Sequence, residues 1–106
     1  MPNSFVTNLY PTPTPNTIQE KIVLDSSSTS ESKTTTYSTL TKYIVLDVQD
    51  ADAFIRFDGQ THNQTTKGHR LYAGRSYTFS KAALEVASFI RAGSVTSNIF
   101  LSEFTN

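Results

Sequence analysis

The sequence predicts an all-β protein, a small antiparallel β-sandwich or barrel with one short helix and an extended N-terminal arm. Three observations lead to this fold class: short stretches of alternating apolar and polar residues, turn residues between them, and abundant serine and threonine. A chain of 106 residues fits one domain. It contains no cysteine, so disulfides cannot reinforce a thin core, and association between copies is a common alternative.

The first part of the chain differs in composition from the rest. All four prolines lie within the first fifteen residues, and we expect residues 1–17 to form an extended arm because proline fixes the backbone and removes an N–H donor. Residues 18–40 are expected to hold one strand and then a polar loop rich in serine and threonine. The strand places three apolar residues on one face, Ile18, Ile22 and Leu24. Residues 26–36 are so polar that we expect a mobile loop.

Residues 41–106 are expected to form the compact β-sandwich module. The segments KYIVLDV, AFIRFDG and SYTFS alternate, and each turns its apolar residues to one side. The inward residues are Ile44, Leu46, Val48, Ala53, Ile55, Phe57, Tyr77 and Phe79. KAALEVA is the one segment with helical character, too short to be stable alone. Turns are expected at Asp58-Gly59 and at Gly93-Ser94.

Charge and hydropathy narrow the classes of partner. Nine basic and nine acidic residues give a formal net charge of zero, which argues against a nucleic-acid-binding face. No stretch approaches the roughly 20 apolar residues of a membrane span, and the first residues lack the pattern of a secretory signal. We therefore expect neither nucleic acid nor membrane as a partner.

The polar residues that could carry chemistry do not form a known pattern. His62 and His69 are seven residues apart, without the spacing of a zinc site, so we expect them to be surface loop residues. Asp47, Asp50 and Asp52 are expected to cap turns, with calcium binding as an open alternative. Neither a nucleophile elbow nor a glycine-rich phosphate loop is present. We predict no catalytic residue, no metal and no cofactor.

Aromatic residues fall on both faces of the predicted sheets. Phe54, Tyr72 and Phe100 lie on the side opposite the core, where an antiparallel sheet normally meets solvent. Apolar side chains there indicate that another molecule covers them, and a neighbouring copy is the simplest candidate. We expect a homo-oligomer, with a trimer favoured.

Residues 43–104 contain a series of short motifs. An aromatic strand ends in a glycine turn in AFIRFDG, a Thr/Asn-rich loop follows, and a second strand ends in LYAG. The aromatic strand YTF comes next, and the last pair of strands contains IRAG and LSE. In this order the motifs resemble the small β-sandwich virion proteins of tailed bacteriophages. The chain departs from that pattern in the loop THNQ, where a proline is common.

The resemblance implies a non-enzymatic virion structural protein, made in the host cytoplasm and placed on the capsid surface. Such capsid decoration or cement proteins associate with themselves and bind the major capsid protein or other virion proteins. The residues predicted to bind partners come from the arm and the sheet surfaces: Phe5, Val6, Leu9, Tyr10, Pro11, Pro13, Pro15, Ile18, Ile22, Phe54, Tyr72 and Phe100.

Two other functions stay open at this point. One is a neck or tail ring component of the same particles. The other is a carbohydrate-binding module that uses Tyr72 or Tyr37 as a stacking platform, with calcium at the three aspartates.

Overall fold

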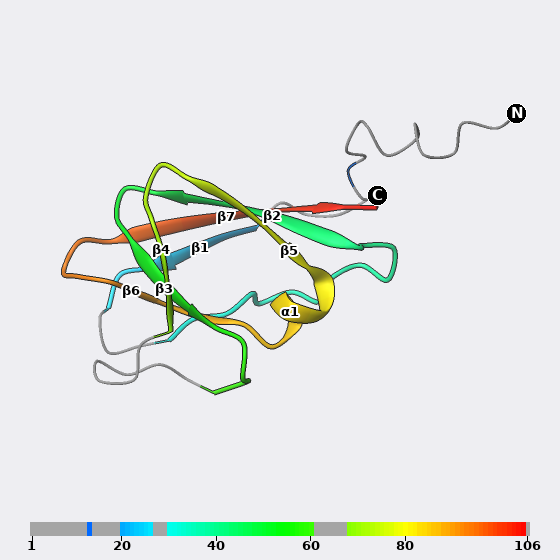
Figure 1. Cartoon of the computed structure of the whole chain (residues 1–106), viewed down its shortest axis with the longest axis horizontal. Coiled ribbons are helices and arrows are strands. Elements are labelled where there is room, and N and C mark those ends of the chain that lie inside the picture. The colour runs from blue at the N-terminus through cyan, green and yellow to red at the C-terminus, as the bar shows by residue number, and fades with distance from the viewer. Residues whose placement is uncertain (1–12, 14–19, 27–29, 61–67, 106) are drawn as a thin grey trace, which may run out of the picture.

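A computed structural model describes Pro13 and residues 20–26, 30–60 and 68–105. This part of the chain contains seven strands and one short helix (Figure 1). The elements in chain order are β1 (Glu20–Leu24), β2 (Tyr43–Gln49), β3 (Ala53–Arg56), β4 (His69–Leu71), β5 (Ser76–Ser80), α1 (Lys81–Glu85), β6 (Ser88–Arg91) and β7 (Ser97–Phe104). The predicted small all-β fold with one short helix is confirmed.

The strands form two antiparallel sheets. One sheet has four strands in the order β1-β7-β2-β5, and the other has three in the order β4-β3-β6. Figure 1 shows α1 at one end of the molecule, where the chain passes from β5 of the larger sheet to β6 of the smaller one. β1 and β7 are neighbours although they lie at opposite ends of the described sequence.

The core lies between the inward faces of the two sheets. In β2 the alternation is complete, since Ile44, Leu46 and Val48 are at most 1% exposed. Ala53 and Ile55 of β3 are fully buried, and Tyr77 and Phe79 of β5 pack against the same core as partly buried rings. The alternating pattern therefore predicts the inward face of these strands correctly, because successive side chains of a strand point to opposite faces.

Helix α1 is short and depends on two local features. The Ser80 hydroxyl accepts a hydrogen bond from the Ala83 backbone N–H at 3.2 Å, which caps the first turn. Leu84 is buried and anchors the helix to the core. Because five residues do not form a stable helix in isolation, the cap and the buried Leu84 side chain hold it in place. Among the described residues, no helix has the length and apolar character needed to cross a membrane.

Two expectations about the region before residue 41 are corrected. Residues 30–36 are not a loose loop, since Glu31 and Phe89 exchange two backbone hydrogen bonds of 2.8 and 2.7 Å. Ile22 is 5% exposed and belongs to the core, so it does not face a partner. β1 pairs with β7 at the edge of the larger sheet, and its Ile22 and Leu24 side chains belong to the core on the side that faces β6.

Candidate interaction surfaces

The outer face of the four-stranded sheet carries apolar side chains in place of a fully polar surface. Val23 is 40% exposed, and Val45 and Phe100 are half-buried on the same side. At one end of this face the rings of Tyr43 and Phe104 stack with centroids 5.3 Å apart. An antiparallel sheet with one free face usually shows polar residues there, so this composition is typical of an interaction surface.

Opposite charges flank the centre of this face. Strand register places Lys21 of β1 beside Phe100 of β7, and Phe100 beside Asp47 of β2. The Lys21 Nζ atom lies 5.8 Å from the centre of the Phe100 ring. Asp47 accepts a hydrogen bond of 2.5 Å from the Ser76 hydroxyl on the next strand. We call the row Lys21–Phe100–Asp47 the charged row.

A second surface lies on the outer side of the smaller sheet and the turn after β4. The Arg70 guanidinium is 5.6 Å from the ring centres of both Phe54 and Tyr72. The Arg75 guanidinium lies 5.4 Å from the centre of the same Tyr72 ring. Tyr72 is 48% exposed. We call these four residues, Phe54, Arg70, Tyr72 and Arg75, the arginine–aromatic ladder. Cation–π contacts of this kind hold each side chain in a defined position.

Asp52 and Tyr77 hold the ladder in position through hydrogen bonds. The Asp52 carboxylate accepts hydrogen bonds from Arg70 Nε at 3.0 Å and Nη2 at 2.8 Å, and from the Ala73 N–H at 2.7 Å. The Ala73 hydrogen bond, followed by those from Arg70, lowers the pKa of Asp52. The Tyr72 N–H donates to the Tyr77 hydroxyl at 2.9 Å. The backbone of the ladder is therefore anchored to the sandwich.

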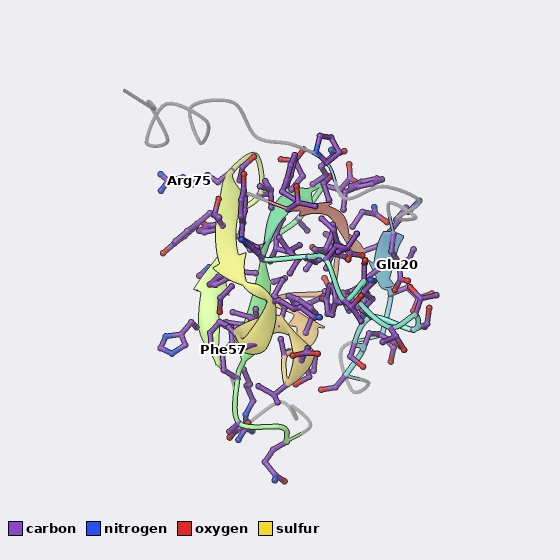
Figure 2. All side chains as sticks on the ribbon, turned by 90° about the vertical axis from the view of Figure 1, so that its right-hand side faces the viewer. Glu20, Phe57 and Arg75 are labelled. Carbon is purple, nitrogen blue, oxygen red and sulfur yellow. The ribbon has the colours of Figure 1, made fainter. Side chains whose placement is uncertain are left out.

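The turn that presents Arg75 requires a glycine. Gly74 has a φ of 83°, a left-handed conformation that costs glycine little, and its N–H donates to the Val48 carbonyl at 2.8 Å. Figure 2 shows the Arg75 side chain projecting from the molecule on the side opposite Glu20. Within the described residues no carboxylate pairs with Arg75. Two guanidinium groups and one carboxylate leave the ladder and Asp52 with one net positive charge.

A buried polar network joins the segment before β2 to the inward face of β7. Glu103 points inward from β7 and accepts hydrogen bonds from Lys33 Nζ at 2.6 Å, the Thr41 hydroxyl at 2.6 Å and the Ser38 N–H at 3.0 Å. Lys33 Nζ also lies 3.8 Å from the centre of the Tyr37 ring. We call these five residues the Glu103 network. They attach the segment before β2 to the end of β7.

Burial and hydrogen bonding act in opposite directions on Glu103. Burial favours the neutral carboxyl, but the hydrogen bonds from Lys33, Thr41 and Ser38 outweigh it and lower the pKa of Glu103. Burial, with the negative charge of Glu103 nearby, raises the pKa of Tyr37. The network is thus a salt bridge with a neutral tyrosine beside it.

A cleft of about 520 Å³ lies next to this network. Its walls are residues 32–37, Gly59 and Gln60, and residues 84–88. Hydroxyl and amide groups line it together with the apolar residues of α1 and the turn after it, and Lys33 is already engaged by Glu103. Among the described lining residues we find no hydrogen-bonded pair of nucleophile and base of the kind that acyl or glycosyl transfer requires.

The residues predicted to bind partners do not form one site. Phe54 and Tyr72 belong to the ladder, whereas Phe100 lies on the outer face of the larger sheet. Pro13 forms an isolated antiparallel bridge with Phe104. The remaining predicted residues lie outside the described part of the chain: Phe5, Val6, Leu9, Tyr10, Pro11, Pro15 and Ile18.

The polar residues considered for metal binding are separated. His62 lies outside the described residues, and His69 is exposed with its ring 6.2 Å from that of Phe57. Asp50 accepts a hydrogen bond from Asn98, so the three aspartates each have a different side-chain partner. The described residues contain no cluster of three metal-ligating side chains.

Comparisons of the chain with family models, curated proteins and solved structures found no match. The surfaces are therefore interpreted from their own chemistry. Sequence reasoning missed Arg70 and Arg75, although the segment HRLYAGR alternates cations with a tyrosine and carries the signal. It also missed the pairing of Lys33 with Glu103, for which only the acidic residue on an inward strand position was a sign.

Proposed function

We propose that this protein is a non-enzymatic assembly protein of the kind that decorates or cements the capsid of a tailed phage. The observation that carries the proposal is the arginine–aromatic ladder, an exposed and well-anchored set of side chains. Arginine and aromatic residues are enriched in protein–protein interfaces, and tyrosine and arginine dominate their hot spots. The motif resemblance supplies the class of particle.

The ladder suits a protein partner because its geometry exists before binding. Asp52, Tyr77 and Gly74 hold the backbone and the Arg70 guanidinium in place. Little conformational freedom is therefore left to lose when a partner binds, which improves affinity. Arg75 can form a two-pronged interaction with a carboxylate while the Tyr72 ring buries apolar area. A capsid subunit with an acidic patch beside an apolar side chain is the complementary surface.

The outer face of the four-stranded sheet is proposed to supply the contacts between copies. On this face Val23 is 40% exposed, and Val45 and Phe100 are half-buried. With one surface for the particle and another for self-association, a small protein can link neighbouring capsid subunits. The N-terminal arm, residues 1–17, is proposed as a further contact with the particle, as expected from its proline-rich composition.

The test combines particle binding with one matched set of variants. We expect the purified protein to co-sediment with phage particles and to appear on their capsid surface in cryo-microscopy. Tyr72→Ala and Arg75→Ala should abolish co-sedimentation, whereas Thr78→Ala, an exposed change on β5, should preserve it. Absence of the wild-type protein from particles would contradict the proposal. Density at the neck or tail in place of the capsid would identify the ring component instead.

Deletion of residues 1–17 separates the arm from the ladder. We expect the shortened protein to fold with an unchanged circular dichroism spectrum and to lose particle binding. Binding at wild-type affinity by the shortened protein would exclude the arm as a contact.

The exposed ring of Tyr72 also favours a second candidate, a carbohydrate-binding module. Its other proposed platform is excluded, because Tyr37 is 7% exposed and lies under Lys33. A glycan array would support this candidate if wild-type protein binds a defined sugar and Tyr72→Ala does not. Equal signals from both proteins would exclude a role for this ring.

A further inference from the structure

We propose that the outer face of the four-stranded sheet binds the same face of a second copy, around a two-fold axis parallel to the strands. The inference rests on the proposed function, since it specifies how copies of an assembly protein would contact each other. It is carried by the charged row, in which Lys21 and Asp47 stand on either side of Phe100.

The charged row is complementary to itself. Neighbouring strands are about 4.8 Å apart, so Lys21 and Asp47 lie at equal distances on opposite sides of Phe100. A two-fold axis above β7 and parallel to it exchanges the two sides. Lys21 of one copy then faces Asp47 of the other copy, and the same pairing occurs a second time. The two Phe100 rings meet at the centre.

The orientation of the axis follows from the signs of the charges. A two-fold axis across the strands at the same row would place Lys21 opposite Lys21 and Asp47 opposite Asp47. Like charges that face each other across an interface oppose association, whereas complementary charges fix the register. The parallel axis is therefore the arrangement that the charged row favours.

The remaining side chains of the face fit a sheet-on-sheet contact. Val23 lies in one row next to Phe100, beside Asn98 and Gln49, and Val45 lies in the other, beside Ser102 and Thr78, so two valines and several small polar side chains surround the ring. Stacked sheets lie about 10 Å apart with their strands within about 30° of each other, which leaves room for interdigitated rings and for a lysine to reach an aspartate. A buried aromatic side chain at the centre with charged and polar groups around it is a common composition of a protein interface.

A charge-swap experiment tests the arrangement. We would measure the mass of the wild-type protein by sedimentation equilibrium, together with Lys21→Asp, Asp47→Lys and the double variant. The wild-type protein should be a dimer. Each single variant should dimerise about tenfold or more weakly, because both pairs become repulsive. The double variant should recover dimerisation because it restores both pairs with reversed polarity.

A mixture of the two single variants provides the sharpest result. In a heterodimer of Lys21→Asp with Asp47→Lys, both contacts again join opposite charges, so the equimolar mixture should associate although neither component does alone. Lys81→Asp, the same charge change on α1, is the matched control and should dimerise like the wild-type protein. Circular dichroism confirms that each variant is folded.

Several outcomes would overturn the inference. Single variants that dimerise normally, or a mixture that fails to associate, would exclude the two-fold contact. A wild-type trimer that is insensitive to the swaps would favour another interface. If deletion of residues 1–12 abolished the dimer and the charge swaps had no effect, the contact between copies would be assigned to residues 1–12 and not to the sheet face.

The two proposals fail separately. A wild-type monomer that still co-sediments with particles through the ladder would contradict this inference and leave the proposed function standing. Dimers that obey the charge swaps but never bind particles would contradict the proposed function and retain the two-fold contact.

Discussion

Two ion pairs of this protein join distant parts of the chain in opposite environments. The side chains of Lys33 and Glu103 are 4% and 2% exposed, whereas those of Arg70 and Asp52 are 47% and 26% exposed. The distances are similar, at 2.6 and 2.8 Å. The buried pair holds a polar segment onto the sandwich, and the exposed pair orients a surface side chain. Surroundings, more than distance, therefore determine what an ion pair contributes.

The largest effect is expected from removing one partner of the buried pair. Glu103→Ala should lower the free energy of unfolding by about 3–5 kcal/mol, because it leaves Lys33 charged, buried and uncompensated. Urea denaturation of the variant and of the wild-type protein measures the difference. A loss below about 1 kcal/mol, the range of exposed pairs, would show that burial does not distinguish the two ion pairs.

Replacing both partners should recover part of this loss. The double variant Lys33→Met/Glu103→Leu removes the charge together with its partner, so we expect it to be about 2 kcal/mol more stable than Glu103→Ala. Recovery remains incomplete because the Thr41 hydroxyl and the Ser38 N–H lose their acceptor. The same denaturation series measures it. A double variant less stable than the single one would show that the network matters more than the buried charge.

Acid should reduce the contribution of the Glu103 network to the stability of the folded protein. The pKa of Glu103 is lowered in the folded protein, so its contribution is fully present above the ordinary value of 4.5 and is lost as the pH falls from there through the lowered pKa. The free energy of unfolding, measured between pH 7 and pH 3, should decrease on acidification. Glu103→Gln should flatten this decrease. Some slope should remain, since the pKa of Glu20 is also lowered by hydrogen bonds from Thr34 and Thr35 that outweigh burial.

The smallest effect on stability is expected at the exposed pair. Asp52→Asn should change the thermal midpoint less than Glu103→Gln does, because solvent screens Arg70 once its partner is neutral. Its effect should appear instead as a changed NMR resonance of the Arg70 Nε–H and as weaker particle binding. Equal destabilisation by the two variants would show that the buried and the exposed ion pair contribute equally to stability.

The sequence predicts the inward residues of the sandwich well, and for a simple reason. Ile44, Leu46 and Val48 occupy every second position of β2, and alternate side chains of a strand point to the same face. The same rule puts Glu103 on the inward face with Leu101, but it does not say which cation meets it. Lys33 comes from a segment without periodicity, so its path depends on the finished sandwich.

The candidate surfaces follow from the sequence only in part. The aromatic residues Phe54, Tyr72 and Phe100 are identifiable as extra apolar residues on outward strand positions. Their grouping is not, because it depends on the order of strands in each sheet. Strand order places Phe54 and Tyr72 around Arg70 and sends Phe100 to the other sheet. The charged row likewise exists only because β7 lies between β1 and β2.

The position of β7 also determines when the chain can fold during synthesis. This strand is the last to leave the ribosome among the described elements, yet it pairs with both β1 and β2. Until residues 97–104 emerge, β1 has no neighbour among the described strands of its sheet, and β2 is paired along one edge only, with β5. A nascent chain must therefore carry apolar strands without their sheet neighbours until β7 has been synthesised, a state that favours chaperone binding.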